Sequence, residues 1–207
     1  MIPYDEHKDN IQFGDIEDKM GWNGSPTSMV YFDNVRIHKK YMIGIENEGF
    51  KYAMMALDGG RLNIAACSLG AAHRCLEEAI KYSLEPRTTF NKPNIASFQH
   101  IQFEIANLAS DLHCSRLMLR DAATKLDNNH DQKTMYCAMA KKKVTDLGFD
   151  ICNRSLQIFG GYGYLAEYEI ERFVRDCRVH QILEGTNEIM NVVVSRILLD
   201  PKLNNVQ

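Results

Sequence analysis

The sequence contains no apolar run approaching the roughly 18 residues that a membrane-spanning helix needs. Its first residues, Met1 to Asn10, are polar and acidic, whereas a signal or transit peptide is apolar or rich in arginine. We therefore expect no membrane insertion, and we recognise no targeting signal in the chain as it stands.

A strong charge of either sign is also missing, because 24 basic residues face 27 acidic ones. The one basic run, Lys141 to Lys143, lies inside an apolar periodic stretch without interleaved aromatic residues, which argues against a nucleic-acid surface. No Cys-x-x-Cys pair occurs, so neither a zinc site nor a disulfide framework is expected. All six cysteines are predicted to be reduced and buried: Cys67, Cys75, Cys114, Cys137, Cys152 and Cys177.

A short region near the N-terminus has the pattern of β-strands. Alternating residues from Ser28 to Phe32 are flanked by turn formers, which predicts strands between about Gly14 and Ile43. Two or three strands have exposed edges and bury too little apolar surface to be stable alone. We therefore interpret residues 1–45 as the incomplete end of a β-domain, whose parent sequence extends upstream or has been truncated in this chain.

From Gly49 onward the apolar residues recur at helical spacing. Long helices are predicted from Gly49 to just before Pro86, over about residues 101–128, and over about residues 132–159. Two shorter helices are predicted over about residues 167–176 and 186–199. Long antiparallel helices with short connections favour a mainly α fold, an up-down helical bundle over residues 46–207.

Glu184 is the clearest chemical signal, because Gly185 and Thr186 follow it just before the last predicted helix. Gly185 lets the backbone approach a ligand closely, and Thr186 can cap the helix with its hydroxyl group. From spacing alone, however, an acid at the start of a helix more often only complements the helix dipole.

Three weaker signals accompany it. The run Asp58 to Arg61 places two glycines inside a predicted helix. Each glycine destabilises the helix by roughly 1 kcal/mol relative to alanine, and either a bound ligand or close helix packing would offset this loss. The helix end from Gln157 to Tyr164 holds more glycine than a C-cap requires. The loop after Pro86 combines residue types that suit a phosphate and a flat ring but also occur without function: Arg87, Thr89, Phe90 and then Gln99.

Five longer stretches of the sequence join these signals: Asn47 to Phe50, Gly59 to Ala65, Ser68 to His73, Gly160 to Leu165 and Val174 to Gly185. In order and spacing, they resemble the acyl-CoA dehydrogenase family over about residues 21–199, and most closely its isobutyryl-CoA branch. The resemblance implies an FAD-dependent α,β-dehydrogenation of a short branched acyl-CoA such as isobutyryl-CoA, in the mitochondrial matrix.

This resemblance implies that Glu184 is the catalytic base, which takes the substrate's α-proton while a hydride leaves the β-carbon for the flavin. Some members of the family carry the base immediately before the arginine that matches Arg61. Gly60 stands there in this sequence, so Glu184 is the only candidate base. The implied substrate contacts are Asp58, Gly59, Gly60, Arg61, Gly185 and Arg196.

Further roles are implied around FAD. Arg87, Thr89, Phe90 and Gln99 match a loop that reaches the FAD of a neighbouring subunit, and Gln157, Gly160 and Gly161 match a helix end near the adenosine part of the same FAD. Thr186, Asn187 and Glu188 match contacts beside the cofactor. The resemblance also implies an active homo-oligomer, a dimer or tetramer, that passes electrons to electron-transfer flavoprotein, with no metal.

The sequence departs from the family pattern in several places. Asn91 follows Phe90 where glycine is usual, residues 93–95 carry one extra residue that weakens the match at Gln99, and His38 replaces a common proline. The N-terminal helical domain and most of the β-domain, which supplies most contacts to the isoalloxazine ring, have no counterpart here. We therefore expect the isolated chain to be inactive and to hold no FAD stably.

Two other functions stay open. The chain could be a non-catalytic helical assembly module derived from the family, which a bound flavin would exclude. An acyl-CoA oxidase shares the fold and the base but passes electrons to oxygen, and the match to the isobutyryl-CoA branch ranks it lower.

Overall fold

The computed structural model describes residues 2–87 and 89–201. Contacts divide the chain into two compact units, one ending at Ala56 and one beginning at Leu57. This division falls inside the first long helix, whereas the domain boundary predicted from the sequence, at residues 45 and 46, stays a prediction. Within the described ranges, no helix combines the length and apolarity that crossing a membrane requires.

The first unit contains a small antiparallel ribbon. Strand β1 (Ile11–Phe13) pairs with β2 (Val30–Phe32), with Gln12 opposite Tyr31. Of the predicted strand range, only β2 forms a strand, and β1 lies before that range, so this prediction was wrong in extent. A ribbon of two strands has no second layer to cover it, and all three residues of β2 are exposed. The first unit also contains the short helices α1 (Tyr4–His7), η1 (Lys8–Asn10) and η2 (Lys39–Tyr41).

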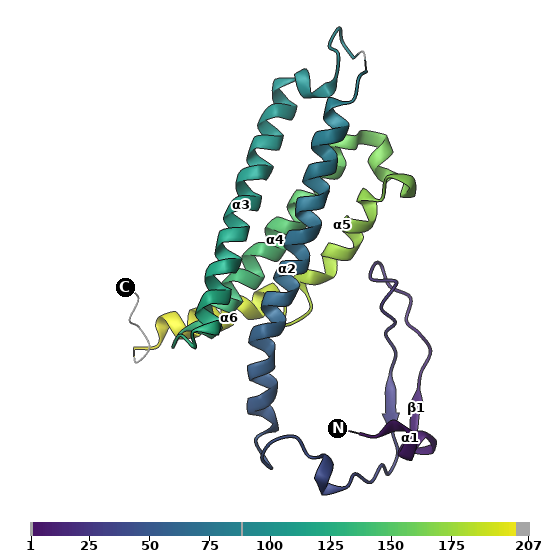
Figure 1. Cartoon of the computed structure of the whole chain (residues 1–207), viewed down its shortest axis with the longest axis vertical. Helices are drawn as coiled ribbons and strands as arrows, with labels where there is room; N and C mark the ends of the chain where they lie inside the picture. The colour runs from purple at the N-terminus through teal and green to yellow at the C-terminus, as the bar shows by residue number, and fades with distance from the viewer. Residues whose placement is uncertain (1, 88, 202–207) are drawn as a thin grey trace. The chain divides into compact units, whose positions relative to one another are not determined.

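Five helices form where the helical periodicity predicted them, and Figure 1 shows the three longest running lengthwise in alternating directions. The short α5 starts three residues later than predicted, because a 3-10 turn (η5, Ala166–Tyr168) and the left-handed residue Glu169 precede it. The helices are α2 (Gly49–Leu84), α3 (Gln99–Asp127), α4 (Lys133–Phe159), α5 (Ile170–Arg178) and α6 (Asn187–Leu199). The remaining 3-10 turns are η3 (Ile95–Ser97), η4 (Gly160–Tyr164) and η6 (Val179–Gln181).

The core of the second unit is centred on α4, which packs against α3, α5 and α6. One cluster of buried residues draws Leu76 from α2, Leu108 from α3, Ile151 from α4 and Ile170 from α5. Helices α2 and α4 approach closely where Gly148 of α4 faces Ser68 of α2. A shared apolar cluster of this kind explains why the periodic sequence segments form one bundle.

The cysteines only partly follow the prediction. Four of them are buried, and all six are unpaired by disulfides. Cys67 and Cys114 are exposed, which corrects the expectation that every cysteine is buried. Both lie inside long helices, on faces turned away from the core, where a small thiol is tolerated in water.

Candidate active site

Glu184 lies in a tight turn that joins η6 to α6. Its backbone is left-handed, with φ of 57°, and Gly185 follows with φ of 90°. A Cβ added to Gly185 would lie 2.8 Å from the Met190 Cε atom, so a larger residue would be both strained and crowded there. Thr186 is the N-cap of α6, and its hydroxyl accepts a hydrogen bond from the Ile189 N–H at 3.4 Å, which confirms the predicted cap.

The half-buried side chain of Glu184 rests against α2 at Gly60. A Cβ added to Gly60 would lie 2.4 Å from the Glu184 Oε2 atom, whereas a Cβ added to Gly59 would meet nothing within 4 Å. Close packing therefore explains one of the two helical glycines. Among the described residues, none forms a hydrogen bond or ion pair with the Glu184 carboxylate, so its oxygens are available to a proton.

Asp58 and Arg61 form a buried ion pair on the same helix, with Arg61 Nη1 3.0 Å from Asp58 Oδ1. The second oxygen of Asp58 accepts a hydrogen bond from the Thr134 hydroxyl at 2.6 Å. The Nε atom of Arg61 is buried and has no partner within the described chain. A buried donor without a partner is unfavourable, and a ligand acceptor would satisfy it.

Lys141 of α4 forms hydrogen bonds to the turn that carries Glu184. The sequence did not indicate this contact. The side chain of Lys141 is fully buried, and its Nζ atom donates to the Gly185 carbonyl and to Asn187 Oδ1, both at 2.8 Å. Burial lowers the pKa of Lys141 to about 8. Asn187, predicted to contact the cofactor, thus has its side chain engaged by α4.

Asp146 on α4 holds the turn from both sides. Its Oδ1 atom accepts hydrogen bonds from Gln181 Nε2, before Glu184, and from Asn187 Nδ2, after it, each at 2.7 Å. Thr145 adds a bond from Asn187 Nδ2 at 3.0 Å. The conformation of the turn is thus set by side chains of a neighbouring helix as well as by the glycine.

A pocket of about 150 Å³ lies beside this turn. Three predicted cofactor contacts are in its lining: Thr186, Asn187 and Glu188. The pKa of Glu188 lies below its usual value, because the carboxylate is hydrogen-bonded by its own backbone N–H and by Thr186. The remaining residues of its lining are Asp146, Arg178, Gln181 and Ile182.

Another group of predicted residues gathers at the opposite end of the long helices. The Arg87 guanidinium lies 4.3 Å from the centre of the Tyr82 ring, which in turn stacks on Phe159 at 4.2 Å. The Tyr82 hydroxyl donates to the Phe159 carbonyl at 3.1 Å, just before Gly160 ends α4. Gly160 has φ of 60°, and an added Cβ would meet nothing within 4 Å, so the backbone is open at this helix end.

The other members of this distal group surround the same helix ends. Phe90 is 89% exposed and touches Phe98 edge to face, with ring centres 6.4 Å apart. Thr89 belongs to the same loop, and Gln99 begins α3. Gln157 is exposed in the last turn of α4, and Gly161 follows the helix end.

The two groups are far apart within one chain. At about 1.5 Å per residue, Tyr82 lies roughly 33 Å along α2 from Gly60. The structure therefore brings Arg87 and Gly160 together but does not bring them to Glu184. Arg196 is also separate, since it is exposed roughly 14 Å along α6 from Asn187.

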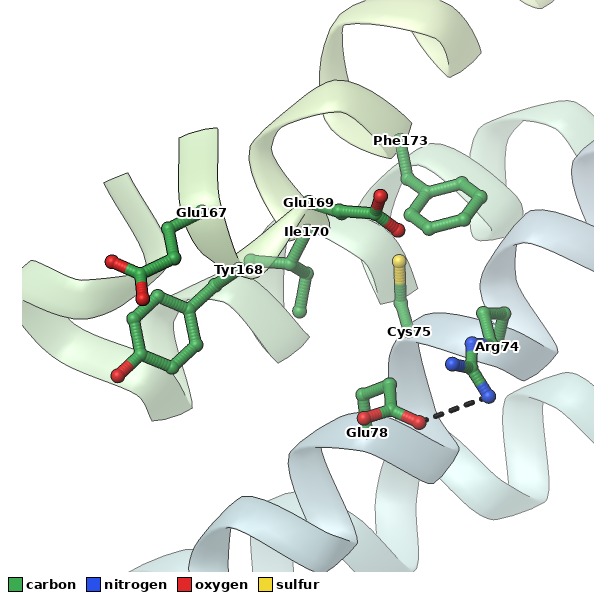
Figure 2. A pocket seen from close by; sticks show the side chains of 8 residues that line it. All are labelled: Arg74, Cys75, Glu78, Glu167, Tyr168, Glu169, Ile170 and Phe173. Atoms are coloured by element: carbon green, nitrogen blue, oxygen red, sulfur yellow. Dashed lines mark ion pairs between the residues drawn. The ribbon is translucent and has the colours of Figure 1, made fainter. Parts of the chain in front are cut away.

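A larger pocket, of about 270 Å³, contains none of the predicted site residues (Figure 2). It lies between α2 and the beginning of α5, where Arg74 Nη1 pairs with Glu78 Oε1 at 2.9 Å. Its lining is Arg74, Cys75, Glu78, Glu167, Tyr168, Glu169, Ile170 and Phe173. Pocket size alone does not mark the candidate active site in this chain.

Fold and site together define a helical-bundle domain that carries, on a strained turn, a carboxylate without a hydrogen-bond or ion-pair partner among the described residues. The acyl-CoA dehydrogenase C-terminal domain matches residues 47–199. Mitochondrial isobutyryl-CoA dehydrogenase from Bos taurus is 48% identical over 91% of this chain and 45% of its own. The chain therefore belongs to the acyl-CoA dehydrogenase family.

Two further comparisons agree. The caffeyl-CoA reductase-Etf complex subunit CarC from Acetobacterium woodii is 42% identical, over 94% of this chain and 51% of its own. The structure of butyryl-CoA dehydrogenase from Megasphaera elsdenii superposes with a TM-score of 0.87 at 39% identity, covering 92% of this chain and 49% of that one. The chain thus spans about half the length of the relatives it matches.

Proposed function

We propose that this chain carries the base-bearing part of an FAD-dependent acyl-CoA dehydrogenase that acts on a short branched acyl-CoA such as isobutyryl-CoA. The observation that carries the proposal is the Glu184 carboxylate, half-buried on its left-handed turn and without a partner in the described chain. The similarity to isobutyryl-CoA dehydrogenases of Bos taurus and Dictyostelium discoideum, at 48% and 46% identity, supports the substrate class.

In the proposed reaction, Glu184 takes the α-proton of the acyl thioester. The electron pair of that C–H bond becomes the α,β double bond, and the product is the trans-2-enoyl-CoA. FAD, when bound, accepts the hydride that leaves the β-carbon. A positioned general base contributes about 10²- to 10⁴-fold to such a step.

Neighbouring residues would bind and orient the substrate. We assign Gly59, Gly60 and Gly185 to the acyl thioester site: Gly59 leaves open space, Gly60 makes room for the Glu184 carboxylate, and Gly185 allows the turn that carries it. The buried Arg61 Nε offers a donor without a partner in the described chain. Asp58 holds Arg61 in place through the 3.0 Å ion pair. Arg196 is proposed as a more distant contact, because it lies well along α6 from the turn.

The distal group fits one edge of a dinucleotide. Arg87 supplies a cation, and Gly160 and Gly161 expose backbone with open space where side chains would be. We assign this group, with Thr89, Phe90, Gln99 and Gln157, to the FAD of a neighbouring subunit, because it lies roughly 33 Å along α2 from the Glu184 site. Thr186, Asn187 and Glu188 would lie beside the FAD of their own subunit. The active form would then be a homo-oligomer.

Location and electron acceptor are proposed from relatives. Two similar proteins are described as mitochondrial, which supports the mitochondrial matrix. A relative described as a subunit of a reductase-Etf complex supports electron-transfer flavoprotein as the partner. An oxidase would instead reduce oxygen when mixed with substrate.

The test uses a fused protein, in which the part of bovine isobutyryl-CoA dehydrogenase that precedes its matched region is placed before this chain. Glu184→Gln should retain FAD and bind isobutyryl-CoA, while flavin reduction falls by about 10⁴-fold or more. Glu77→Gln, an exposed substitution on α2, should reduce its flavin at the parent rate. A Glu184→Gln variant that reduces its flavin at the parent rate would show that another group is the base.

The 207-residue chain by itself supplies a second readout. We expect it to self-associate in sedimentation at micromolar concentration, without a stable yellow colour. Stoichiometric FAD on this chain would contradict the expectation that it holds no cofactor alone. A fused protein that assembles without binding FAD would favour the alternative, a non-catalytic helical assembly module.

A further inference from the structure

Lys141 is an unusual core residue. It is fully buried in α4, yet no carboxylate of the described chain lies within ion-pair distance of its Nζ atom. Its two hydrogen-bond acceptors, the Gly185 carbonyl and the Asn187 side-chain amide, are neutral. Burying an ammonium group on neutral partners is unfavourable, so its place in the core indicates a specific task.

The turn that Lys141 contacts is strained and needs external support. A left-handed backbone is unfavourable for a residue with a Cβ, and Glu184 adopts it. Asp146 fixes the flanks of the turn through Gln181 and Asn187. Lys141 is the α4 residue that binds the backbone carbonyl directly after Glu184, at Gly185.

Charged groups from several elements surround the Lys141 ammonium. Asp146 on α4, Glu188 on α6 and Glu184 in the turn attract it, while Arg61 on α2 repels it. The geometric contacts of the Lys141 Nζ atom are with the turn, through the Gly185 carbonyl and Asn187 Oδ1. Lys141 thus ties α4 to the segment that directly follows the Glu184 carboxylate.

We propose that Lys141 is a positioning residue for Glu184: by holding the Gly185 carbonyl and Asn187, it keeps the turn in the left-handed form that aims the carboxylate at Gly60. The holding of the turn is a property of this chain alone. The effect on catalysis rests on the proposed function, in which Glu184 is the base.

The first experiment measures hydrogen exchange at the backbone amides of residues 182–189 in the 207-residue chain. Lys141→Met preserves most of the side-chain volume and removes both hydrogen bonds. Exchange in this segment should become at least about 10-fold faster, while exchange in α3 stays unchanged. Lys143→Met is the matched control, because Lys143 is an exposed lysine on the same helix, and it should exchange like the parent.

The second experiment places the same substitution in the fused protein. Flavin reduction by isobutyryl-CoA should fall by about 10- to 100-fold, while the Kd for the substrate changes by less than about 3-fold. In the Glu184→Gln background, Lys141→Met should cause little further loss, since there is no base left to position. A purely structural role would lower both backgrounds by the same factor.

Each outcome has a separate meaning. Unchanged exchange in residues 182–189 of Lys141→Met overturns the proposal, whatever the enzyme activity is. An additive loss in the double variant overturns the positioning role. If Glu184→Gln reduces its flavin at the parent rate, the assignment of Glu184 as the base is refuted. The hydrogen-exchange result alone then decides whether Lys141 holds the turn. If Lys141→Met does not fold, Lys141→Gln, which keeps an N–H donor, should show a smaller acceleration of exchange in the same segment.

Discussion

The Glu184 carboxylate occupies the space that a side chain at residue 60 would fill, since a Cβ on Gly60 would lie 2.4 Å from Glu184 Oε2. The two positions are 124 residues apart in the sequence and come from a helix and a turn. A side chain at residue 60 and the present position of Glu184 therefore exclude each other. This relationship makes Gly60 part of the candidate active site although it has no functional group.

Gly60→Ala should separate stability from catalysis. The methyl group meets the end of a flexible side chain, so Glu184 can swing away, and alanine favours the helix by up to about 1 kcal/mol. We expect thermal stability of the 207-residue chain to be unchanged or slightly raised. In the fused protein, flavin reduction by isobutyryl-CoA should fall by at least about 10-fold, because the base is displaced.

Gly59→Ala is the control for this substitution. An added Cβ at residue 59 meets nothing within 4 Å, so it should give the same gain in helix stability. We predict that the melting temperature rises in Gly59→Ala and is unchanged or slightly raised in Gly60→Ala, and that the rate of flavin reduction falls only in Gly60→Ala. Equal rates in the two variants would show that Glu184 does not need its observed position.

Gly148→Ala should destabilise the bundle, because the added Cβ would lie 2.7 Å from Ser68 Oγ and 3.1 Å from the Ser68 carbonyl. The carbonyl belongs to α2 and cannot move without shifting the helix. We expect a loss of about 1–3 kcal/mol in the free energy of unfolding, measured by urea denaturation. Gly70→Ala on the exposed side of α2 meets nothing and should instead stabilise by up to about 1 kcal/mol.

The helices were predictable from the sequence because their apolar period extends over many turns. The predicted first helix, from Gly49 to before Pro86, is confirmed by α2, and the predicted end near Phe159 by α4. The strands were predicted less well, because the run from Ser28 to Phe32 has the residue types of a strand, whereas Val30 to Phe32 bury nothing in the described ribbon. Composition alone does not distinguish a strand in a full sheet from an exposed ribbon.

The candidate active site was predictable only in part. Glu184, Gly185 and Thr186 were recognisable because they are neighbours in the sequence before a helix. In the sequence Lys141 belongs to a basic run of three lysines, yet three successive helical residues spread over about 200° of the helix surface. Since α4 has a wide buried face, one of the three lysines had to lie near the core. The contact with Gly185 depends on tertiary packing, which a single sequence does not contain.

The ion pair between Glu104 on α3 and Arg154 on α4 should make the free energy of unfolding depend on pH in the acidic range. Arg154 donates to both Glu104 oxygens, at 2.5 and 2.8 Å, and this lowers the pKa of Glu104 below 4.5. A lowered pKa stabilises the folded chain above pH 4.5, and the contribution disappears as pH falls through the folded value. Glu104→Gln should lose about 1–2 kcal/mol at pH 7 in urea denaturation, and the difference from the parent should shrink below pH 4.5.

Glu77→Gln provides the comparison for this pair. Glu77 pairs with His73 at 3.4 Å, and both side chains are about half exposed. Exposed pairs contribute little, so the loss at pH 7 should stay below about 0.5 kcal/mol. A similar loss in both variants would mean that the contact between α3 and α4 contributes no more than a surface charge.

Lys141 should make the free energy of unfolding depend on pH in the alkaline range. Its pKa is lowered from 10.5 to about 8 by burial, so between these values the unfolded chain binds the proton and the folded chain does not. The unfolded state then binds more protons, and the free energy of unfolding rises with pH over this window. The unfavourable burial of the charge is fully present below about pH 8 and is relieved as the ammonium loses its proton. The slope attributable to Lys141 can reach about 1.4 kcal/mol per pH unit.

Urea denaturation of the parent chain and of Lys141→Met between about pH 7 and pH 10 measures this slope. Other lysines, tyrosines and cysteines titrate in the same range, but they are shared by both chains and cancel in the difference. The parent should gain stability relative to Lys141→Met as pH rises above about 8. Lys143→Met should follow the parent at every pH, because Lys143 is exposed. A difference between parent and Lys141→Met that does not change with pH would show that Lys141 keeps its proton in the folded chain, and that its hydrogen bonds to Gly185 and Asn187 offset the burial of the charge.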